Sequence, residues 1–384
     1  MTMQSIYFDN NASTPLAPEV REAMAPYLAE WFGNPASSHR FGEAARRGLD
    51  LAREQVAGLL GCHPGRIVLN SGGTEGNNTA ILSAVWGNPG KKHIISSQVE
   101  HGSVLAPLEF LASQGYEVEL LGVDENGGLD LETLKGAIRS DTALVSLMGA
   151  NNETGVIWPM AEIGGICRER GVLFHCDAIQ LAGKAILSAE ALEVDYLTIA
   201  GHKLHGPKGA GALYVRRTVP FTPLIMGSGQ EHGRRSGTEN VPGLVGLGAA
   251  CALAMAVDEA AHQRLAALRD HLEAGIIAAI PEVRINGAAS PRLVNTINVS
   301  FRHAASAGLI QDLDAGGIAV SAHAACESGD LDPSHVLRAM RVPEPFLHGT
   351  LRISLSRYNT EAEVAALLAL LPQAVARSRQ GFAL

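Results

Sequence analysis

A lysine flanked by glycines follows a short apolar run near the middle of the sequence. Residues 198–200 are apolar or β-branched, and Lys203 lies between Gly201 and Gly206. Glycine relieves backbone crowding, and a lysine at the end of a buried strand is a candidate for a desolvated amine that forms a Schiff base. A lysine in a glycine-rich turn is otherwise an ordinary solvated residue. This stretch alone leaves both interpretations open.

Two further segments supply groups with which such an amine could work. The apolar run 172–176 ends in Asp177, and a carboxylate at a strand end can pair with a pyridinium nitrogen. Residues 67–78 read as a strand, a glycine turn and a helix start, which presents backbone N–H groups and a hydroxyl to a phosphate. A lysine, a carboxylate and a phosphate cradle together predict a site for pyridoxal 5'-phosphate.

Composition limits the class of protein and of ligand. The 384 residues are 46% hydrophobic and 18% charged, which is typical of a globular chain with one large domain and a smaller one. The net charge of −9 comes without a long basic run, so we expect no direct nucleic-acid ligand. The five scattered cysteines lack CxxC spacing, which predicts reduced thiols and no metal site. Four of them, all except Cys326, are expected to be small core residues.

The sequence shows no signal peptide and no membrane span. No basic segment followed by an apolar one is found near Met1, so we expect a cytoplasmic protein. The most apolar segment, residues 364–371, is far shorter than a bilayer requires, and we expect Pro372 to interrupt its continuation. A membrane partner is therefore not predicted.

Apolar periodicity predicts an α/β fold in which helices and strands alternate. Helices are expected over roughly 18–32, 43–60, 75–86, 102–114, 129–139 and 161–170, and strands at 67–70, 93–97, 143–148, 172–176, 195–200 and 211–215. The alternation predicts βαβ units and a mostly parallel sheet with helices on both faces. Ligands then bind beyond the carboxyl ends of the strands.

The pattern changes in the last third of the chain. After Pro242 an Ala/Leu-rich region runs to about Ile280 and is expected to form one long helix that joins two domains. Three β-rich runs follow, at 293–301, 318–320 and 351–355. We therefore expect a large domain over 16–262 and a small α+β domain formed by 1–15 with 263–384.

Short motifs recur in a fixed order along nearly the whole chain. They are residues 7–15, 33–39, 73–75, 99–101, 151–155, 177–180, 201–203, 229–231, 235–238 and 351–354, together with Cys326. Through these motifs the chain resembles the cysteine desulfurases of the NifS/IscS type, which are class V, fold type I pyridoxal-phosphate enzymes. The resemblance implies a large domain with a mostly parallel mixed sheet and a small domain that carries a catalytic cysteine loop.

The resemblance also implies roles around the cofactor. Lys203 would hold it as a Schiff base and would move the proton at the substrate Cα. Asp177 would keep the pyridine nitrogen protonated, and Gln180, with Asn152 close by, would bond the phenolic oxygen. His101 would stack on the ring and take part in proton transfer, although a hydrogen-bonded histidine at a strand end is the plainer interpretation. The phosphate ligands would be Gly73, Thr74, His202 and, from a neighbouring subunit, Thr238.

Substrate and sulfur complete the implied site. Arg352 would clamp the substrate carboxylate, because a planar guanidinium matches it bidentately, although alternation alone would also give an arginine on a sheet surface. Asn34 and Asn152 would bind substrate as well. Cys326 would carry the sulfur as a persulfide, and its small or acidic neighbours argue against a core cysteine. We expect Asp332 and Pro333 to start a helix over 334–340.

The chain departs from the usual family pattern at three places. Residues 322–324 read Ala-His-Ala where the family usually has Ser-Gly-Ser, and Glu327 stands where an uncharged residue is usual. Ala200 stands where the family has Ser or Cys. These changes leave the cofactor site as predicted and bear on the reactivity and partner of the thiol.

The implied function is that of a homodimeric L-cysteine desulfurase. It would convert L-cysteine to L-alanine and pass the sulfur from Cys326 to an acceptor or scaffold protein, as for iron–sulfur cluster assembly. Two alternatives stay open on the sequence: a related class V lyase or aminotransferase in which Cys326 is incidental, and a weakly active sulfur-relay scaffold.

Overall fold

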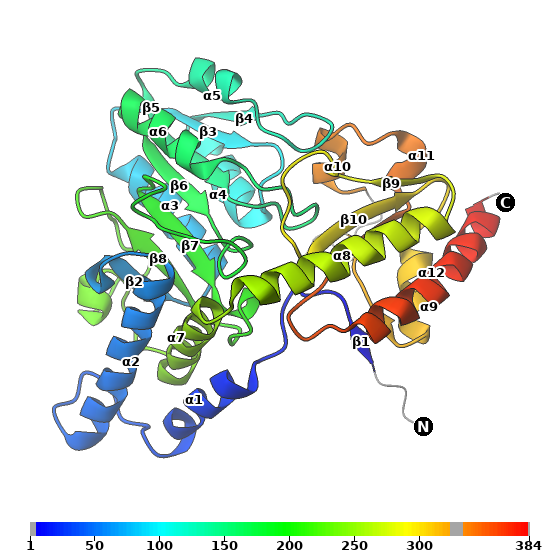
Figure 1. Cartoon of the computed structure of the whole chain (residues 1–384). Coiled ribbons are helices and arrows are strands. Elements are labelled where there is room, and N and C mark those ends of the chain that lie inside the picture. The colour runs from blue at the N-terminus through cyan, green and yellow to red at the C-terminus, as the bar shows by residue number, and fades with distance from the viewer. Residues whose placement is uncertain (1–4, 323–332, 383–384) are drawn as a thin grey trace.

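The structure is a computed structural model that describes residues 5–322 and 333–382. A larger part with a seven-stranded sheet lies beside a smaller part with a three-stranded sheet (Figure 1). The first strand and the last helix that the structure describes both lie in the smaller part. The predicted division into 16–262 and 1–15 with 263–384 stays a prediction.

The large sheet has the strand order β2-β8-β7-β6-β5-β3-β4. Its strands are β2 (Ile67–Asn70), β3 (His93–Ser97), β4 (Glu117–Leu121), β5 (Thr142–Met148), β6 (Leu173–Asp177), β7 (Tyr196–Ala200) and β8 (Gly211–Val215). Strand β8 runs antiparallel to its two neighbours, and all other pairs are parallel. The mostly parallel sheet is confirmed. Strand β4 was not predicted, because this edge strand is largely exposed and lacks an apolar run.

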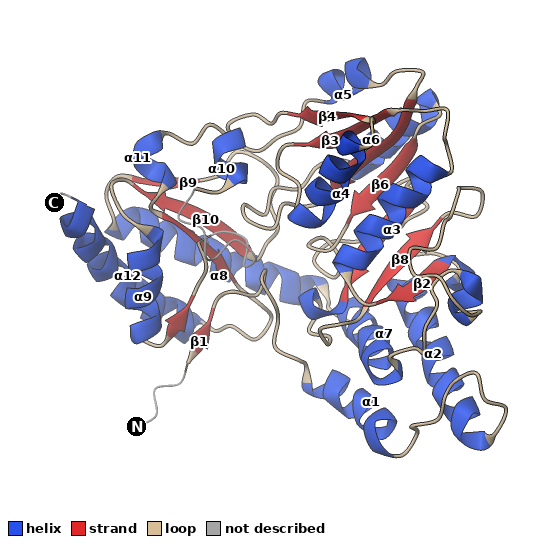
Figure 2. Cartoon of the chain, turned by 180° about the vertical axis from the view of Figure 1, so that it is seen from behind, coloured by secondary structure: helices blue, strands red, loops and turns tan. Residues whose placement is uncertain are grey.

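Helices cover both faces of this sheet (Figure 2). They are α1 (Pro18–Ala29), α2 (Arg40–Leu59), α3 (Gly73–Trp86), α4 (Gly102–Ser113), α5 (Leu131–Ala137), α6 (Met160–Arg170) and α7 (Val241–Met255). Neighbouring residues of a strand point to opposite faces. Ile94 accordingly packs in a cluster with α3 and α4, and Ile95 packs in another with α2, α6 and α7. The sheet is thus a buried middle layer, which explains its near-continuous apolar strands.

The smaller part has its own apolar core. Its sheet has the order β12-β10-β9, and β1 pairs with β11 in parallel. The elements are β1 (Ile6–Tyr7), α8 (Glu259–Ala279), β9 (Val283–Ile285), β10 (Thr296–Phe301), α9 (Ser306–Ala315), β11 (Ile318–Ala319), α10 (His335–Ala339), α11 (Glu344–Leu347), β12 (Thr350–Ser354) and α12 (Glu361–Phe382). Phe8, Leu272, Val299 and Leu367 are fully buried in one cluster there.

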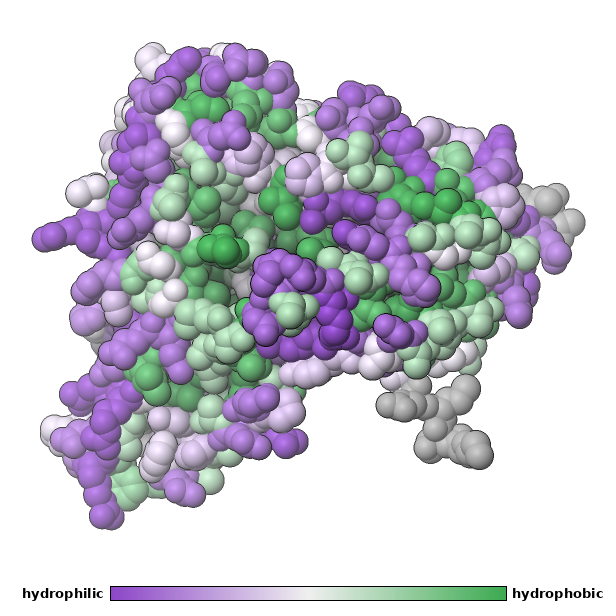
Figure 3. All heavy atoms as spheres, viewed as in Figure 1, coloured by the Kyte–Doolittle hydropathy of each residue, from purple (hydrophilic) through white to green (hydrophobic). Residues whose placement is uncertain are grey.

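The region after Pro242 forms two helices, so the expectation of one long helix is wrong. The axes of α7 and α8 differ by 87°, and α8 alone runs from the larger part to the smaller (Figure 1). Asp258 explains the break, because its carboxylate accepts a hydrogen bond from Ala261 N and caps α8. Within the described residues no single helix is long and apolar enough to cross a membrane, and only this bent pair taken together has the length and composition to do so. Hydrophilic residues interrupt the hydrophobic patches on the face drawn in Figure 3.

Two smaller expectations are also wrong. Helix α12 continues through Pro372, because contacts with α8 and α9 offset the hydrogen bond that proline cannot donate. Ser334 caps α10, since its hydroxyl accepts from Val336 N and Leu337 N, so this helix does not use the cap that the sequence predicted. Asp332 lies outside the described residues.

Candidate active site

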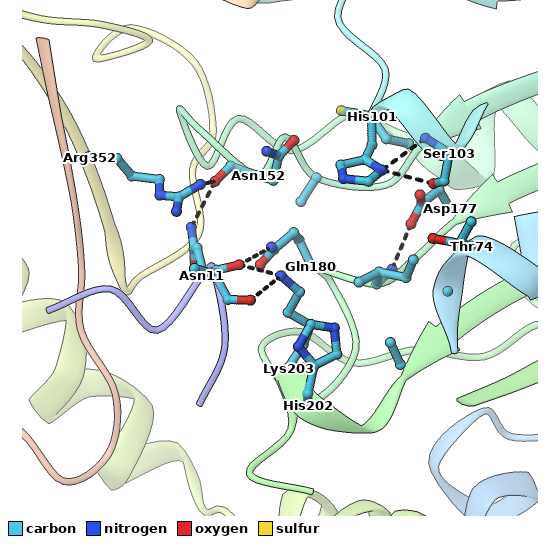
Figure 4. Close-up of a pocket in the computed structure, with 16 residues that line it drawn as sticks. Asn11, Thr74, His101, Ser103, Asn152, Asp177, Gln180, His202, Lys203 and Arg352 are labelled. Atoms are coloured by element: carbon cyan, nitrogen blue, oxygen red, sulfur yellow. Dashed lines mark hydrogen bonds between the residues drawn. The ribbon is translucent and has the colours of Figure 1, made fainter. Parts of the chain in front are cut away.

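Strand ends, helix starts and the N-terminal segment meet around a cavity of about 260 Å³ (Figure 4). The sequence-predicted residues that line it are Gly73, Thr74, His101, Asn152, Asp177, Gln180, His202, Lys203 and Arg352. Asn34 and Thr238 are exposed and lie outside this lining. Cys326 lies outside the described residues, as do His323 and Glu327.

The first turn of α3 forms one end of the cavity. Gly72 has a φ of 147°, and no side chain caps the helix at this point, where Gly73 and Thr74 of its first turn line the cavity. A Cβ on Gly73 would lie 2.2 Å from Ile179 Cδ1, so any larger residue would have to displace the Ile179 side chain. Burial, with the charge of Lys203, lowers the pKa of His202 to about 4. His202 is therefore neutral at pH 7, and this end suits an anion through hydrogen bonds.

Asp177 lies at the end of β6 and is 6% exposed. Its Oδ1 accepts from Ile179 N at 3.0 Å, and its Oδ2 accepts from Asn77 Nδ2 at 2.7 Å. Burial raises the pKa of this carboxyl, and the hydrogen bonds from Ile179 and Asn77 act in the opposite direction. A cation beside Asp177 would therefore favour its ionised form.

Lys203 follows β7 within one turn, in the 3-10 helix Gly201–Lys203. Its Nζ donates to the carbonyl oxygens of Asn11 at 2.5 Å and of Ala12 at 2.9 Å. Gln180 Nε2 donates to the same Asn11 carbonyl at 2.9 Å, and Lys184 Nζ donates to Gln180 Oε1 at 2.8 Å. Burial, then the charges of Lys203 and Arg352, lower the pKa of Lys184 to about 7. The sequence analysis missed Lys184, which stands four residues after Gln180 and gave no other signal.

Arg352 lies on β12 and is only 1% exposed, which excludes a sheet-surface arginine. Its Nη2 pairs with Asp9 Oδ1 at 2.8 Å, and its Nη1 donates to the Asn152 carbonyl at 3.2 Å. The buried Nε has no hydrogen-bond partner among the described residues. The guanidinium is thus oriented at the edge of the cavity with donor capacity left for an anion.

Asn11 links the two parts of the molecule, and the sequence analysis gave it no role. Its N–H donates to Ser354 Oγ at 2.9 Å, and its Nδ2 donates to Thr296 Oγ1 at 2.9 Å and to the Asn152 carbonyl at 3.2 Å. The carbonyl of Asn11 receives Lys203, so this residue joins β10 and β12 to the cavity. Membership in the motif at 7–15 was the only available signal.

The described residues on both sides of segment 323–332 are held near the cavity. Ser321 exchanges backbone hydrogen bonds with Arg352, at 2.6 and 3.2 Å. Ser334 Oγ donates to Glu153 Oε2 at 2.6 Å, and Glu153 is fully buried next to Asn152. Cys326 therefore belongs to a segment whose two flanks are fixed beside cavity residues.

The other cysteines largely behave as core residues. Cys167, Cys176 and Cys251 are buried, whereas Cys62 is half-buried at the edge of the core. Burial raises the pKa of the Cys167 and Cys62 thiols to about 12. No group of three or more His, Cys, Asp or Glu side chains is placed to hold a metal in residues 5–322 and 333–382.

Comparison with known proteins places this site in a family. The aminotransferase class-V family model matches residues 6–367. The chain is 49% identical to a cysteine desulfurase of Trichormus azollae over 377 residues, which cover 98% of this chain and 94% of that protein.

Solved structures of related proteins have the same fold. A NifS-like protein superposes with a TM-score of 0.91 at 38% identity and covers 97% of this chain and 100% of its own. SspA in complex with cysteine superposes with a TM-score of 0.82 at 35% identity, with coverages of 93% and 100%. These matches confirm the predicted α/β fold and the resemblance. The chain belongs to the class-V aminotransferase family and, within it, to the cysteine desulfurases.

Proposed function

We propose that this chain is a pyridoxal-phosphate-dependent L-cysteine desulfurase. It converts L-cysteine to L-alanine and passes the sulfur from Cys326 to an acceptor protein for iron–sulfur cluster assembly. Family membership supports this, and the similar SspA structure contains cysteine. The observation that carries the proposal is that one cavity joins a lysine amine, a buried carboxylate, an uncapped helix start and a buried arginine.

The cavity residues fit pyridoxal phosphate at three points. The N–H groups at the start of α3 and the neutral His202 suit its phosphate. Each carboxylate oxygen of Asp177 accepts one hydrogen bond and keeps a lone pair for a ring N–H cation. Lys203 supplies the amine. When bound, the cofactor supplies an aldehyde that condenses with amines and a ring that delocalises electrons from the substrate Cα.

Each residue has a separate task toward the substrate. The Nζ of Lys203 holds the cofactor and moves the proton at the substrate Cα. Arg352 binds the substrate carboxylate, with its guanidinium oriented by Asp9 and by the Asn152 carbonyl. Asp177 keeps the ring nitrogen protonated, because that cation offsets the cost of burying a carboxylate.

Cys326 is the proposed sulfur acceptor. Its thiolate attacks the substrate sulfur, so that an S–S bond forms while the Cβ–S bond breaks. The electron pair stays on the substrate carbon, which takes up a proton. One L-cysteine and one Cys326 thiol thus give one L-alanine and one Cys326 persulfide, which transfers its outer sulfur to an acceptor thiol.

A homodimer is the proposed active unit. Thr238 is exposed and away from its own cavity, as expected if it contacts a neighbour's cofactor phosphate. The segment after α1 exposes Trp31 and Phe32, the start of α2 exposes Phe41, and Phe32 is 72% exposed. Apolar surface of this kind is typical of protein interfaces. Sedimentation should show a dimer at assay concentration, and a fully active monomer would contradict the proposal.

Product analysis separates this function from its alternatives. With L-cysteine and a thiol reductant, we expect alanine and sulfide in equal amounts. Without the reductant, mass spectrometry should find one extra sulfur on Cys326. A keto acid formed from an amino donor would identify an aminotransferase. If none of these products forms, the remaining hypothesis is the sulfur-relay scaffold. Cys326→Ser should still change the cofactor spectrum on binding cysteine but should form almost no alanine.

A further inference from the structure

The ring of His101 caps the helix that follows it. His101 precedes α4, and its Nδ1 accepts a hydrogen bond from the backbone N–H of Ser103 at 3.0 Å (Figure 4). A backbone N–H can only donate, so Nδ1 must be the unprotonated nitrogen. The neutral imidazole then carries its proton on Nε2.

The Ser103 hydroxyl is a second donor to His101 Nδ1, and it is in turn hydrogen-bonded to Asn77 and, through Asn77, to Asp177. Ser103 Oγ lies 2.8 Å from His101 Nδ1, and it accepts from Asn77 Nδ2 at 2.9 Å. Asn77 Nδ2 also donates to Asp177 Oδ2 at 2.7 Å. Because both hydrogens of this amide nitrogen are then used, the Ser103 hydroxyl hydrogen is directed to His101.

The three residues Ser103, Asn77 and Asp177, which are hydrogen-bonded in series, are buried. Asn77 is fully buried, and Ser103 and Asp177 are 7% and 6% exposed. Their hydrogen bonds therefore do not compete with solvent, and each donor has one available acceptor. The amide of Asn77 cannot turn over without placing its oxygen against the carboxylate of Asp177.

We propose that Ser103 and Asn77 are positioning residues that hold His101 with its proton on Nε2, so that His101 presents a proton donor to the bound substrate. The role toward substrate rests on the proposed desulfurase function, whereas the tautomer does not. His101 thus enters the reaction as a hydrogen-bond or proton donor at Nε2 and acts as a base only after that proton has been delivered. The same chain ties the orientation of His101 to Asp177.

The tautomer can be read directly on the full-length holoenzyme labelled with ¹⁵N-histidine. The His101 signals are identified by their loss in His101→Gln. We expect an unprotonated Nδ1 and a proton on Nε2, and a proton on Nδ1 would overturn the proposal. Because no substrate is present, this result stands even if the protein forms no alanine, in which case the proposed function fails and the tautomer assignment does not.

Variants test the contribution of the hydroxyl and the amide. Ser103→Ala should lower kcat about fivefold with little change in KM, because it removes the hydroxyl that bonds both His101 and Asn77 and leaves Arg352 intact. Ser103→Thr keeps the hydroxyl and should restore kcat. Asn77→Ala should act like Ser103→Ala, and the double variant should cost no more than the larger single effect, because both belong to one chain.

A matched control is Ser83→Ala, since Ser83 is a fully buried serine of α3 bonded to the Thr222 backbone and lies outside the cavity lining. Its kcat should equal that of the wild type. Equal kcat values in Ser103→Ala and the wild type, or the same loss in Ser103→Thr as in Ser103→Ala, would refute the role of Ser103.

Discussion

The two walls of the cavity are built in different ways. The sheet wall consists of Gly73, Thr74, Asp177 and Lys203, which lie at strand ends or at the turns that follow them. The N-terminal wall consists of Asn11, Asn152 and Arg352, and Asp9 supports it from outside the lining, since the hydrogen bond that Arg352 donates to Asp9 joins residues 343 positions apart. The groups proposed to hold the cofactor therefore depend on local strand geometry. The groups proposed to bind the substrate depend on contacts between the two parts of the molecule.

The largest expected effect is on the sheet wall. Lys203→Ala should lower alanine formation by about 10⁴-fold or more, because both the covalent role and the proton transfer are lost. Lys208→Ala is the matched control, since Lys208 is an exposed lysine five residues later. Alanine formation is measured under saturating cysteine, and a near-normal rate in Lys203→Ala would refute the assignment.

On the N-terminal wall, Arg352→Lys should mainly raise KM. The charge remains, but the planar fork that fits a carboxylate and Asp9 is lost, so kcat/KM should fall about 10²-fold. Initial rates over a range of cysteine concentrations give the split between kcat and KM. A fall confined to kcat would place Arg352 outside the substrate site.

Asn11→Ala breaks the contact between the walls without removing the carbonyl that receives Lys203. The buried side chains of Thr296 and Asn295 each lose one of their hydrogen bonds, so the free energy of unfolding should fall by about 1–3 kcal/mol. KM should rise, while cofactor retention should stay near that of the wild type. Loss of cofactor without a change in the free energy of unfolding would contradict the assignment of Asn11 to the N-terminal wall alone.

A pH effect should belong to the sheet wall. His175, two residues before Asp177, is fully buried between Ser146 and Thr198, and burial lowers its pKa to about 3. Between pH 6.5, the usual pKa of histidine, and pH 3, His175 binds a proton only in the unfolded protein. The free energy of unfolding is therefore highest above pH 6.5 and falls as the pH decreases, by at most about 1.4 kcal/mol per pH unit. His175→Gln should flatten the urea midpoint against pH, and parallel curves would contradict this.

The smallest expected effect is a gain. Ala200 lines the cavity, and its Cβ lies 3.7 Å from the Cβ position of Gly73 at the start of α3. Ala200→Ser places a hydroxyl beside the proposed phosphate site, so cofactor release should slow by about threefold to tenfold. Release is followed by absorbance after dilution. Faster release would mean that the buried hydroxyl finds no phosphate oxygen.

The difference between the walls also explains what the sequence could predict. Strands ending in Asp177 and before Lys203 are apolar runs followed by a polar residue, so both their position and their chemistry were visible. Arg352 could be placed on a strand, but its burial depends on Asp9, which no periodicity connects to it.

Residues that act through others left no local signal. Asn77 and Ser103 look like ordinary polar positions of helix starts, and their contact appears only when α3 packs on α4. The break between α7 and α8 depends on one cap at Asp258 in an otherwise apolar helical region. Local pattern therefore predicted elements and strand-end chemistry, and tertiary contacts decided the rest.

The central claim is that Lys203 is the lysine that binds the cofactor. A second half-buried amine, Lys184, donates to the cavity residue Gln180, and its lowered pKa also makes it a candidate nucleophile. Borohydride reduction of the holoenzyme fixes the cofactor to its lysine, and peptide mass spectrometry then locates it. We predict a phosphopyridoxyl group on Lys203 alone. A label on Lys184, or on no lysine, would contradict the account.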